Sequence, residues 1–283
     1  NTAVGYLALE DNTTASYLTA VGKSALGNNT TGGGNTAVGY GALLLNTTGT
    51  GNTAMGQNAL EKITTNSYCT SIGYQTMYDN TGGNNTALGH KGLYANTTGE
   101  SNVAVGSFTL DANTTGDNNT ALGQGSLTVA TTADNNTAVG SAALHLTTTG
   151  GNNTAVGHNG LYSNTTGSYN VSLGRNALYT NATGEYNVSI GYDSLFFNTN
   201  SKNTAVGHRS LHTNTTGYDN TAIGYFALDA NTEGFANTAV GINALDANTT
   251  GDYNNAVGIN ALGSNTTGIQ NVGVGKNALQ SNT

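Results

Sequence analysis

The sequence predicts an all-β protein, a parallel β-solenoid of about 17 coils with about 17 residues in each coil. Three observations lead to this fold class. A glycine that closes an Ala-Val-Gly-like triplet recurs from Gly5 to Gly275 in steps of 17 residues, with two steps of 16. One phase of the repeat carries Leu throughout, except where Met77 replaces it. No apolar pattern with helical spacing extends over a window long enough for a helix.

The repeat reads Asn-Thr-Ala-Val-Gly-x-x-Ala-Leu-x-x-Asn-Thr-Thr-Gly-x-x, and we number its residues as positions 1 to 17. Alternation at positions 2–4 predicts a short strand, as in residues 36–38. The glycine at position 5 predicts a bend, and a second short strand is expected around the Ala-Leu pair, as at residues 42–43. The Asn-Thr-Thr-Gly segment, residues 46–49 here, predicts a turn, because both 16-residue steps lose their residue there.

Repetition has a physical reason, since one repeat offers only about three apolar side chains and cannot form a core alone. Stacked coils bury these side chains in continuous columns. At about 4.8 Å per coil the array would span roughly 80 Å. We therefore expect one elongated domain over residues 1–283, with 16 complete repeats and a partial last one, and a segment of a longer fibre.

The phase of the strand decides which residues face the interior. We expect Val4, Val38 and their equivalents to point into the coil. The small residues of position 3 would then point outward, giving a flat face for another chain; they include Ala3, Ala37, Ala54 and Ala121. The alternative is that a tightly bent coil tolerates only small residues at this position.

Composition narrows the function classes. The formal net charge is −8, and seven Lys and Arg form no basic stripe, which argues against nucleic acid as a partner. No apolar run approaches the length of a membrane span, so no membrane insertion is expected. The only cysteine, Cys69, is expected to be a packed free thiol. Asn recurs at positions 1 and 12, where stacked amides would form ladders along the axis.

The Asn-Thr-Ala-Val-Gly and Asn-Val-Ser-Ile-Gly repeats resemble the Ser-Val-Ala-Ile-Gly motif in the heads of trimeric autotransporter adhesins. The longer repeat is similar to arrays in phage tail-fibre-like and bacterial surface proteins. The resemblance covers essentially the whole chain and matches at the Gly and Val/Ile positions. It implies left-handed coiling and homotrimers, although the adhesin heads use a shorter repeat than 17 residues.

No place in the sequence concentrates the residues of an active site, so we expect no catalytic, cofactor-binding or metal-binding residues and no cofactor. Position 10 predicts a surface ladder of stacked rings in five successive coils: His145, Tyr162, Tyr179, Phe196 and His212. The rings could stabilise one another, pack between subunits or contact sugar rings. The repeat also generates glycosylation sequons on the expected turns, at Asn46, Asn96, Asn113, Asn164, Asn214 and Asn248 among others.

These observations favour a non-enzymatic structural fibre or adhesin shaft of a phage tail fibre or microbial surface appendage. It would be extracellular, on a cell surface or virion. Expected partners are further copies of the chain, as a homotrimer or end-to-end filament, and cell-surface glycans. The alternative class is an ice-binding β-solenoid that orders water along the Thr columns of positions 13 and 14. Against it, those Thr lie in a turn rather than on a flat strand.

Overall fold

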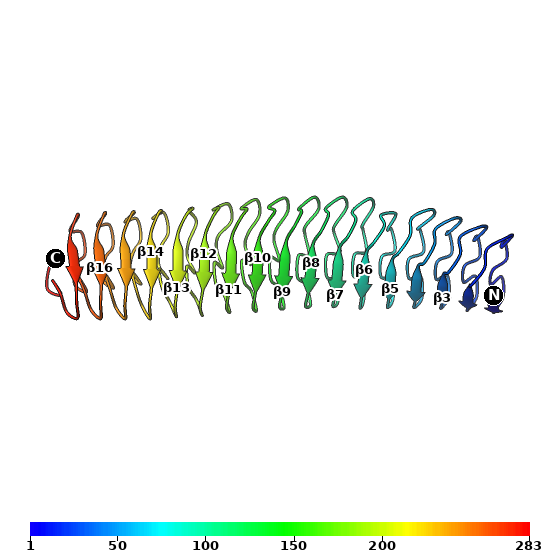
Figure 1. Ribbon diagram of the computed structural model, residues 1–283, viewed down its shortest axis with the longest axis horizontal. Helices are drawn as coiled ribbons and strands as arrows, with labels where there is room; N and C mark the ends of the chain where they lie inside the picture. Colours follow the sequence, from blue (N-terminus) through cyan, green and yellow to red (C-terminus); the bar gives the residue numbers. More distant parts are fainter. The chain divides into compact units, whose positions relative to one another are not determined.

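The computed structural model describes residues 1–283 and divides into two compact units, unit 1 (Asn1–Val139) and unit 2 (Gly140–Thr283). Each unit is a parallel β-solenoid with one three-residue strand per coil, which confirms the predicted fold class. Figure 1 shows the strands of each unit side by side in one row. The described residues contain no helix. A single domain over the whole chain stays a prediction, as does the hand of the coil.

The strands occupy positions 2–4 of every repeat, as predicted. Unit 1 contains β1 (Thr2–Val4), β2 (Thr19–Val21), β3 (Thr36–Val38), β4 (Thr53–Met55), β5 (Thr70–Ile72), β6 (Thr86–Leu88), β7 (Val103–Val105), β8 (Thr120–Leu122) and β9 (Thr137–Val139). Unit 2 contains β10 (Thr154–Val156), β11 (Val171–Leu173), β12 (Val188–Ile190), β13 (Thr204–Val206), β14 (Thr221–Ile223), β15 (Thr238–Val240), β16 (Asn255–Val257) and β17 (Val272–Val274).

Consecutive strands within each unit pair in parallel and in strict register, so equivalent repeat positions lie opposite one another. Thr204, Ala205 and Val206 of β13, for example, face Thr221, Ala222 and Ile223 of β14. Each repeat position therefore forms a column along the unit. A feature that recurs at one position becomes a continuous line of identical contacts.

The second strand expected around Ala-Leu is wrong. Ala42 and Leu43 are both 0% exposed, although adjacent residues of a strand point to opposite faces. The chain turns here, and Leu43 adopts a left-handed φ of 50°, as position 9 does in every coil. The turn aims both side chains inward. Its backbone still bonds to the next coil, since Leu43 N–H donates to the Ala59 carbonyl at 3.1 Å.

The expected strand phase is also wrong. Ala37 and Ala54 are 0% exposed, whereas Met55 is 43% exposed. Val4 is 58% exposed in the first coil, where Ala3 is exposed too; Val38 is half-buried and Ala121 is buried. The position 1 amide faces the interior, and position 3 shares its side of the strand. Ala from positions 3 and 8, Leu from position 9 and the two Asn columns fill the coil. The larger position 4 side chains point outward.

The position 5 glycine is required by close approach of successive coils. Gly224 has a φ of 144°, and a Cβ placed there would lie 2.3 Å from the Gly241 carbonyl oxygen of the next coil. An L-residue would be strained by this backbone and would clash with this oxygen. Packing between successive coils therefore requires the glycine that recurs at position 5 of the repeat.

Candidate functional site

The Asn side chains of position 12 form a buried amide ladder, as predicted. In unit 2, the Asn231 amide nitrogen donates to Asn214 Oδ1 at 2.7 Å and to the Gly234 carbonyl at 2.9 Å. Asn231 Oδ1 accepts from Asn248 at 2.8 Å. The side chain is 0% exposed. Both amide hydrogens and the carbonyl are satisfied without water, which is what a buried amide needs.

Interruptions of this ladder leave polar atoms unpaired. Ile63 and Ala130 stand at position 12 in unit 1, where the repeat has Asn. The preceding members, Asn46 and Asn113, each have a buried Oδ1 without a hydrogen-bond partner. Replacing one Asn of the ladder therefore removes a hydrogen-bond partner from the adjacent Asn.

The Asn side chains of position 1 form a second column with a different pattern. Asn220 donates to the Gly234 carbonyl at 2.7 Å, and its Oδ1 accepts the backbone N–H of Asn237 at 2.9 Å. The Gly234 carbonyl thus accepts one hydrogen bond from each Asn column, from Asn220 at position 1 and from Asn231 at position 12. Cys69 occupies this column, and its thiol contacts the Gly82 carbonyl at 3.4 Å. Burial raises the pKa of Cys69, which confirms a packed free thiol.

The six candidate glycosylation asparagines belong to these buried columns. The expectation that these asparagines lie on an accessible turn is wrong, because their side chains are 0% exposed. They are Asn46, Asn96, Asn113, Asn164, Asn214 and Asn248. The nitrogen that would carry a glycan donates two hydrogen bonds, as in Asn113 to Asn96 and Gly116. A glycan on the folded coil would have to displace both.

Polar side chains of the turn also serve the stacking of coils. Thr215 at position 13 donates its hydroxyl to the Thr232 carbonyl of the next coil at 3.0 Å. At position 16, Asp117 accepts the backbone N–H of Glu100 at 2.7 Å, and Asp134 accepts that of Asp117 at 2.8 Å. The only signal of this capping role in the sequence is that these two aspartates share one repeat position.

The predicted aromatic ladder is present in unit 2, and its five rings are half-buried. The centroids of Tyr162 and Tyr179 lie 5.1 Å apart with 7° between the ring planes, and those of Tyr179 and Phe196 lie 5.0 Å apart. His145 stacks on Tyr162 at 5.1 Å, and His212 is tilted by 33° against Phe196 at 5.6 Å. In unit 1, Tyr78 and Tyr94 stack at 5.5 Å.

Stacking occupies the ring faces that a sugar would use. The faces of Tyr162, Tyr179 and Phe196 are each covered on both sides by the neighbouring rings. Only ring edges and hydroxyls remain at the surface. The geometry favours mutual stabilisation of the rings over contact with a sugar face.

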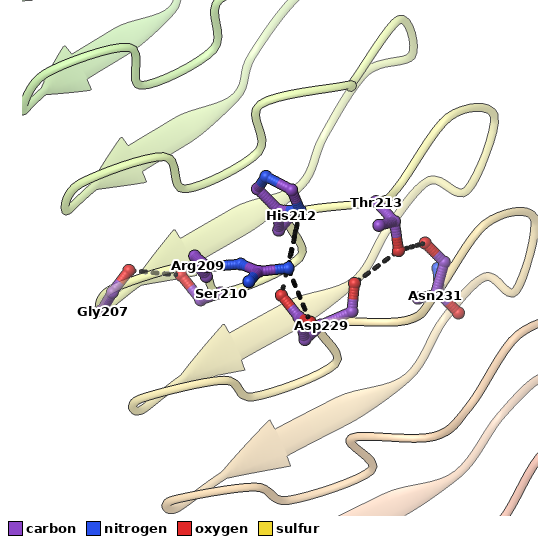
Figure 2. A network of polar contacts seen from close by, with 7 residues as sticks. All are labelled: Gly207, Arg209, Ser210, His212, Thr213, Asp229 and Asn231. Atoms are coloured by element: carbon purple, nitrogen blue, oxygen red, sulfur yellow. Dashed lines mark hydrogen bonds and ion pairs between the residues drawn. The ribbon is translucent and has the colours of Figure 1, made fainter.

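The ladder ends in a polar network that the sequence did not predict (Figure 2). Arg209 donates to Asp229 Oδ2 at 3.2 Å and lies 3.3 Å from His212 Nδ1. His212 and Asp229 occupy position 10 in successive coils, so the column changes from rings to carboxylates at this point. Arg209 also lies over the Phe226 ring at 4.9 Å.

Burial sets the proton affinities of this network. It raises the pKa of Asp229 and Asp246, while the Arg209 guanidinium acts in the opposite direction. Burial, followed by Arg209, lowers the pKa of His212. Both effects favour neutral groups in the folded coil. No three His, Cys, Asp or Glu side chains converge as metal ligands would.

The outward surface of the β-sheet is a regular surface of each unit, because the strands stack in register. Positions 17, 2 and 4 alternate outward along the chain, and we call these three columns the strand face. Position 2 carries mainly Thr and position 4 carries Val, Ile, Leu or Met. Position 4 side chains such as Leu88, Leu173 and Ile223 are 41–45% exposed. This apolar column was assigned to the interior from the sequence, so the strand face was missed.

Comparison of the chain with protein-family models found no matching family, and comparison with curated proteins found no match. The fold itself defines the class: a tandem-repeat parallel β-solenoid. The structure holds no pocket. It also has no helix with the length and apolar character needed to cross a membrane.

Proposed function

We propose that the chain is a non-enzymatic structural fibre segment, whose copies assemble side by side through the strand face. The observation that carries the proposal is the outward-facing apolar column at position 4, whose side chains are exposed or half-buried in both units. Soluble monomers rarely expose contiguous apolar surface beyond a few hundred Å², and larger patches mark interaction sites. Buried amide ladders and in-register strands would supply the stiffness of a shaft.

The strand face is large enough for such a contact. Eight strands at about 4.8 Å, with three columns about 6.7 Å apart, give roughly 500 Å² per unit. A biological interface should bury at least about 1,000 Å² in total, which is about 500 Å² from each partner. The strand face of one unit reaches this lower limit. A cyclic homotrimer is the arrangement that the adhesin-like repeats imply, and an end-to-end filament is the second way in which copies could join.

A shaft of this kind belongs outside the cell, on a cell surface or on a virion. Its attachment to glycans would come from many weak contacts along the fibre. Hydroxyls and ring edges of the aromatic ladder are available for such contacts, whereas the ring faces are not.

Light scattering, with negative-stain microscopy of the same sample, tests the proposal. We expect a discrete oligomer, and a variant with Val206→Asp and Val240→Asp should be monomeric, because each carboxylate would be buried at the contact. The matched control, Thr216→Asp and Thr250→Asp, changes exposed turn residues of the same coils. A wild-type chain that stays monomeric at high concentration would refute side-by-side assembly.

A second candidate, ice binding, is favoured by one observation. The strand face presents Thr and Val in register on the β-sheet, which supplies the strand-borne Thr column that positions 13 and 14 lack. Position 13 hydroxyls are already committed to the next coil, as in Thr215. Thermal hysteresis by a monomeric chain, abolished by Thr204→Glu and Thr221→Glu, would support this function over fibre assembly.

A further inference from the structure

In unit 2, position 2 of the strand face departs from Thr at Val171, Val188, Asn255 and Val272, and of the three Val only Val171 and Val188 have a Tyr beside them at position 17. At β11 and β12, position 17 carries Tyr and position 2 carries Val in the same two successive coils. These residues, with the position 4 side chains beside them, form what we call the apolar patch: Tyr169, Val171, Leu173, Tyr186, Val188 and Ile190. Tyr at position 17 and Val at position 2 coincide nowhere else in the chain.

The apolar patch is exposed and ordered by its own contacts. Tyr169 is 51% exposed and Tyr186 is 53% exposed, and their rings stack at 5.0 Å with 1° between the planes. Val171 is 38% exposed and lies opposite Val188 in the ladder. Two rings and four aliphatic side chains thus cover one continuous area without Asp, Glu, Lys, Arg or His.

The rows on both sides of the patch are polar at positions 17 and 2, while position 4 continues the apolar column with Val156 and Val206. The β10 row carries Asn152 and Thr154 at positions 17 and 2, and the β13 row carries Lys202 and Thr204. An aromatic and aliphatic centre that is flanked by polar residues has the composition of an interface hot spot, where tyrosine is enriched.

We propose that the apolar patch is the site at which a second copy of this chain is anchored. This inference rests on the proposed side-by-side assembly and locates its binding energy. A parallel cyclic arrangement about an axis along the stack of coils brings the same coil of each copy to the same level, so the patches of all copies can meet around that axis. Because the two rings cover each other's inner faces, the patch offers an apolar surface for packing rather than separate faces for sugars.

The test replaces patch residues with the residues that neighbouring coils carry at the same repeat positions. The variant Tyr169→Asn, Val171→Thr, Tyr186→Asn and Val188→Thr introduces only residues that the same columns already carry. Asn also suits the left-handed backbone at position 17, where Tyr169 has a φ of 60° and Asn152 one of 59°. The matched control is Tyr218→Ser with Phe235→Ser. It removes another stacked ring pair, at 4.9 Å on position 16 of the turn, where the repeat also carries Ser.

Sedimentation velocity over a concentration series measures the self-association of each variant, with circular dichroism to verify the fold. We expect the patch variant to associate at least about tenfold more weakly and the control to match wild type. A patch variant that associates like wild type, while Val206→Asp with Val240→Asp dissociates, would overturn the patch and leave the proposed assembly intact. A wild-type chain that never associates would overturn both. Lost glycan-array binding with unchanged association would assign the patch to a glycan instead.

Discussion

The amide ladder predicts a large and local cost for one buried side chain. Asn231→Ala removes three hydrogen bonds, to Asn214, Gly234 and Asn248. At about 1 kcal/mol net for each bond, the loss is about 3 kcal/mol. Asn214 Oδ1 and one Asn248 hydrogen are then left unpaired, while Gly234 keeps its bond from the position 1 amide of Asn220. These buried groups raise the expected cost to roughly 3–5 kcal/mol.

Urea unfolding followed by circular dichroism gives the change in free energy, and amide hydrogen exchange shows whether the affected coils open locally. Thr250→Ala, an exposed turn position, should stay within about 0.5 kcal/mol of wild type. Asn231→Thr should be intermediate, because Thr147 fills this column in unit 2 and its hydroxyl lies 3.3 Å from the Asn164 amide. If Asn231→Ala costs no more than Thr250→Ala, the ladder does not stabilise the coil.

Three further predictions follow from single contacts. Gly224→Ala should lower the free energy of unfolding by more than about 3 kcal/mol, because its Cβ would lie 2.3 Å from the Gly241 oxygen. Gly263→Ala should cost little, since Gly263 has no positive φ and its Cβ would have no contact under 3.3 Å. Thermal melts of the two variants compare these costs. Tyr179→Leu should cost about 1–3 kcal/mol by losing two stacked neighbours, and a urea midpoint like that of wild type would contradict this. The pKa of His212 is lowered in the folded coil, so the fold favours the neutral imidazole. Stability is therefore lost as the pH falls from about 6.5 toward the lowered pKa. His212→Phe should abolish this loss, which thermal melts between pH 7 and pH 5 measure.

The sequence predicted the period, the in-register stacking, the Leu column, the amide ladders and the aromatic ladder. All of these depend on which residues recur at one phase, because stacking turns a phase into a column. The Leu column, for example, is 0% exposed at Leu26, Leu43 and Leu60.

The strand phase could not be read from hydrophobicity, because a period of two has two solutions. We chose the one that buried Val38, although burial of the Asn35 amide places Ala37 inside by the same alternation. The left-handed Leu43 was missed because Leu rarely adopts this backbone. The Arg209–Asp229 pair was missed because Arg occurs at position 7 only once, so no column of repeated contacts signals it.

Cross-linking through the strand face tests the central claim most directly. In a Cys69→Asn background, which restores the consensus residue, Ile223→Cys places one thiol at position 4 and Thr250→Cys places one in the exposed turn. A short bismaleimide should join copies through Ile223→Cys into defined oligomers and leave Thr250→Cys monomeric. Equal cross-linking at both positions, or none at Ile223→Cys, would contradict assembly through this face.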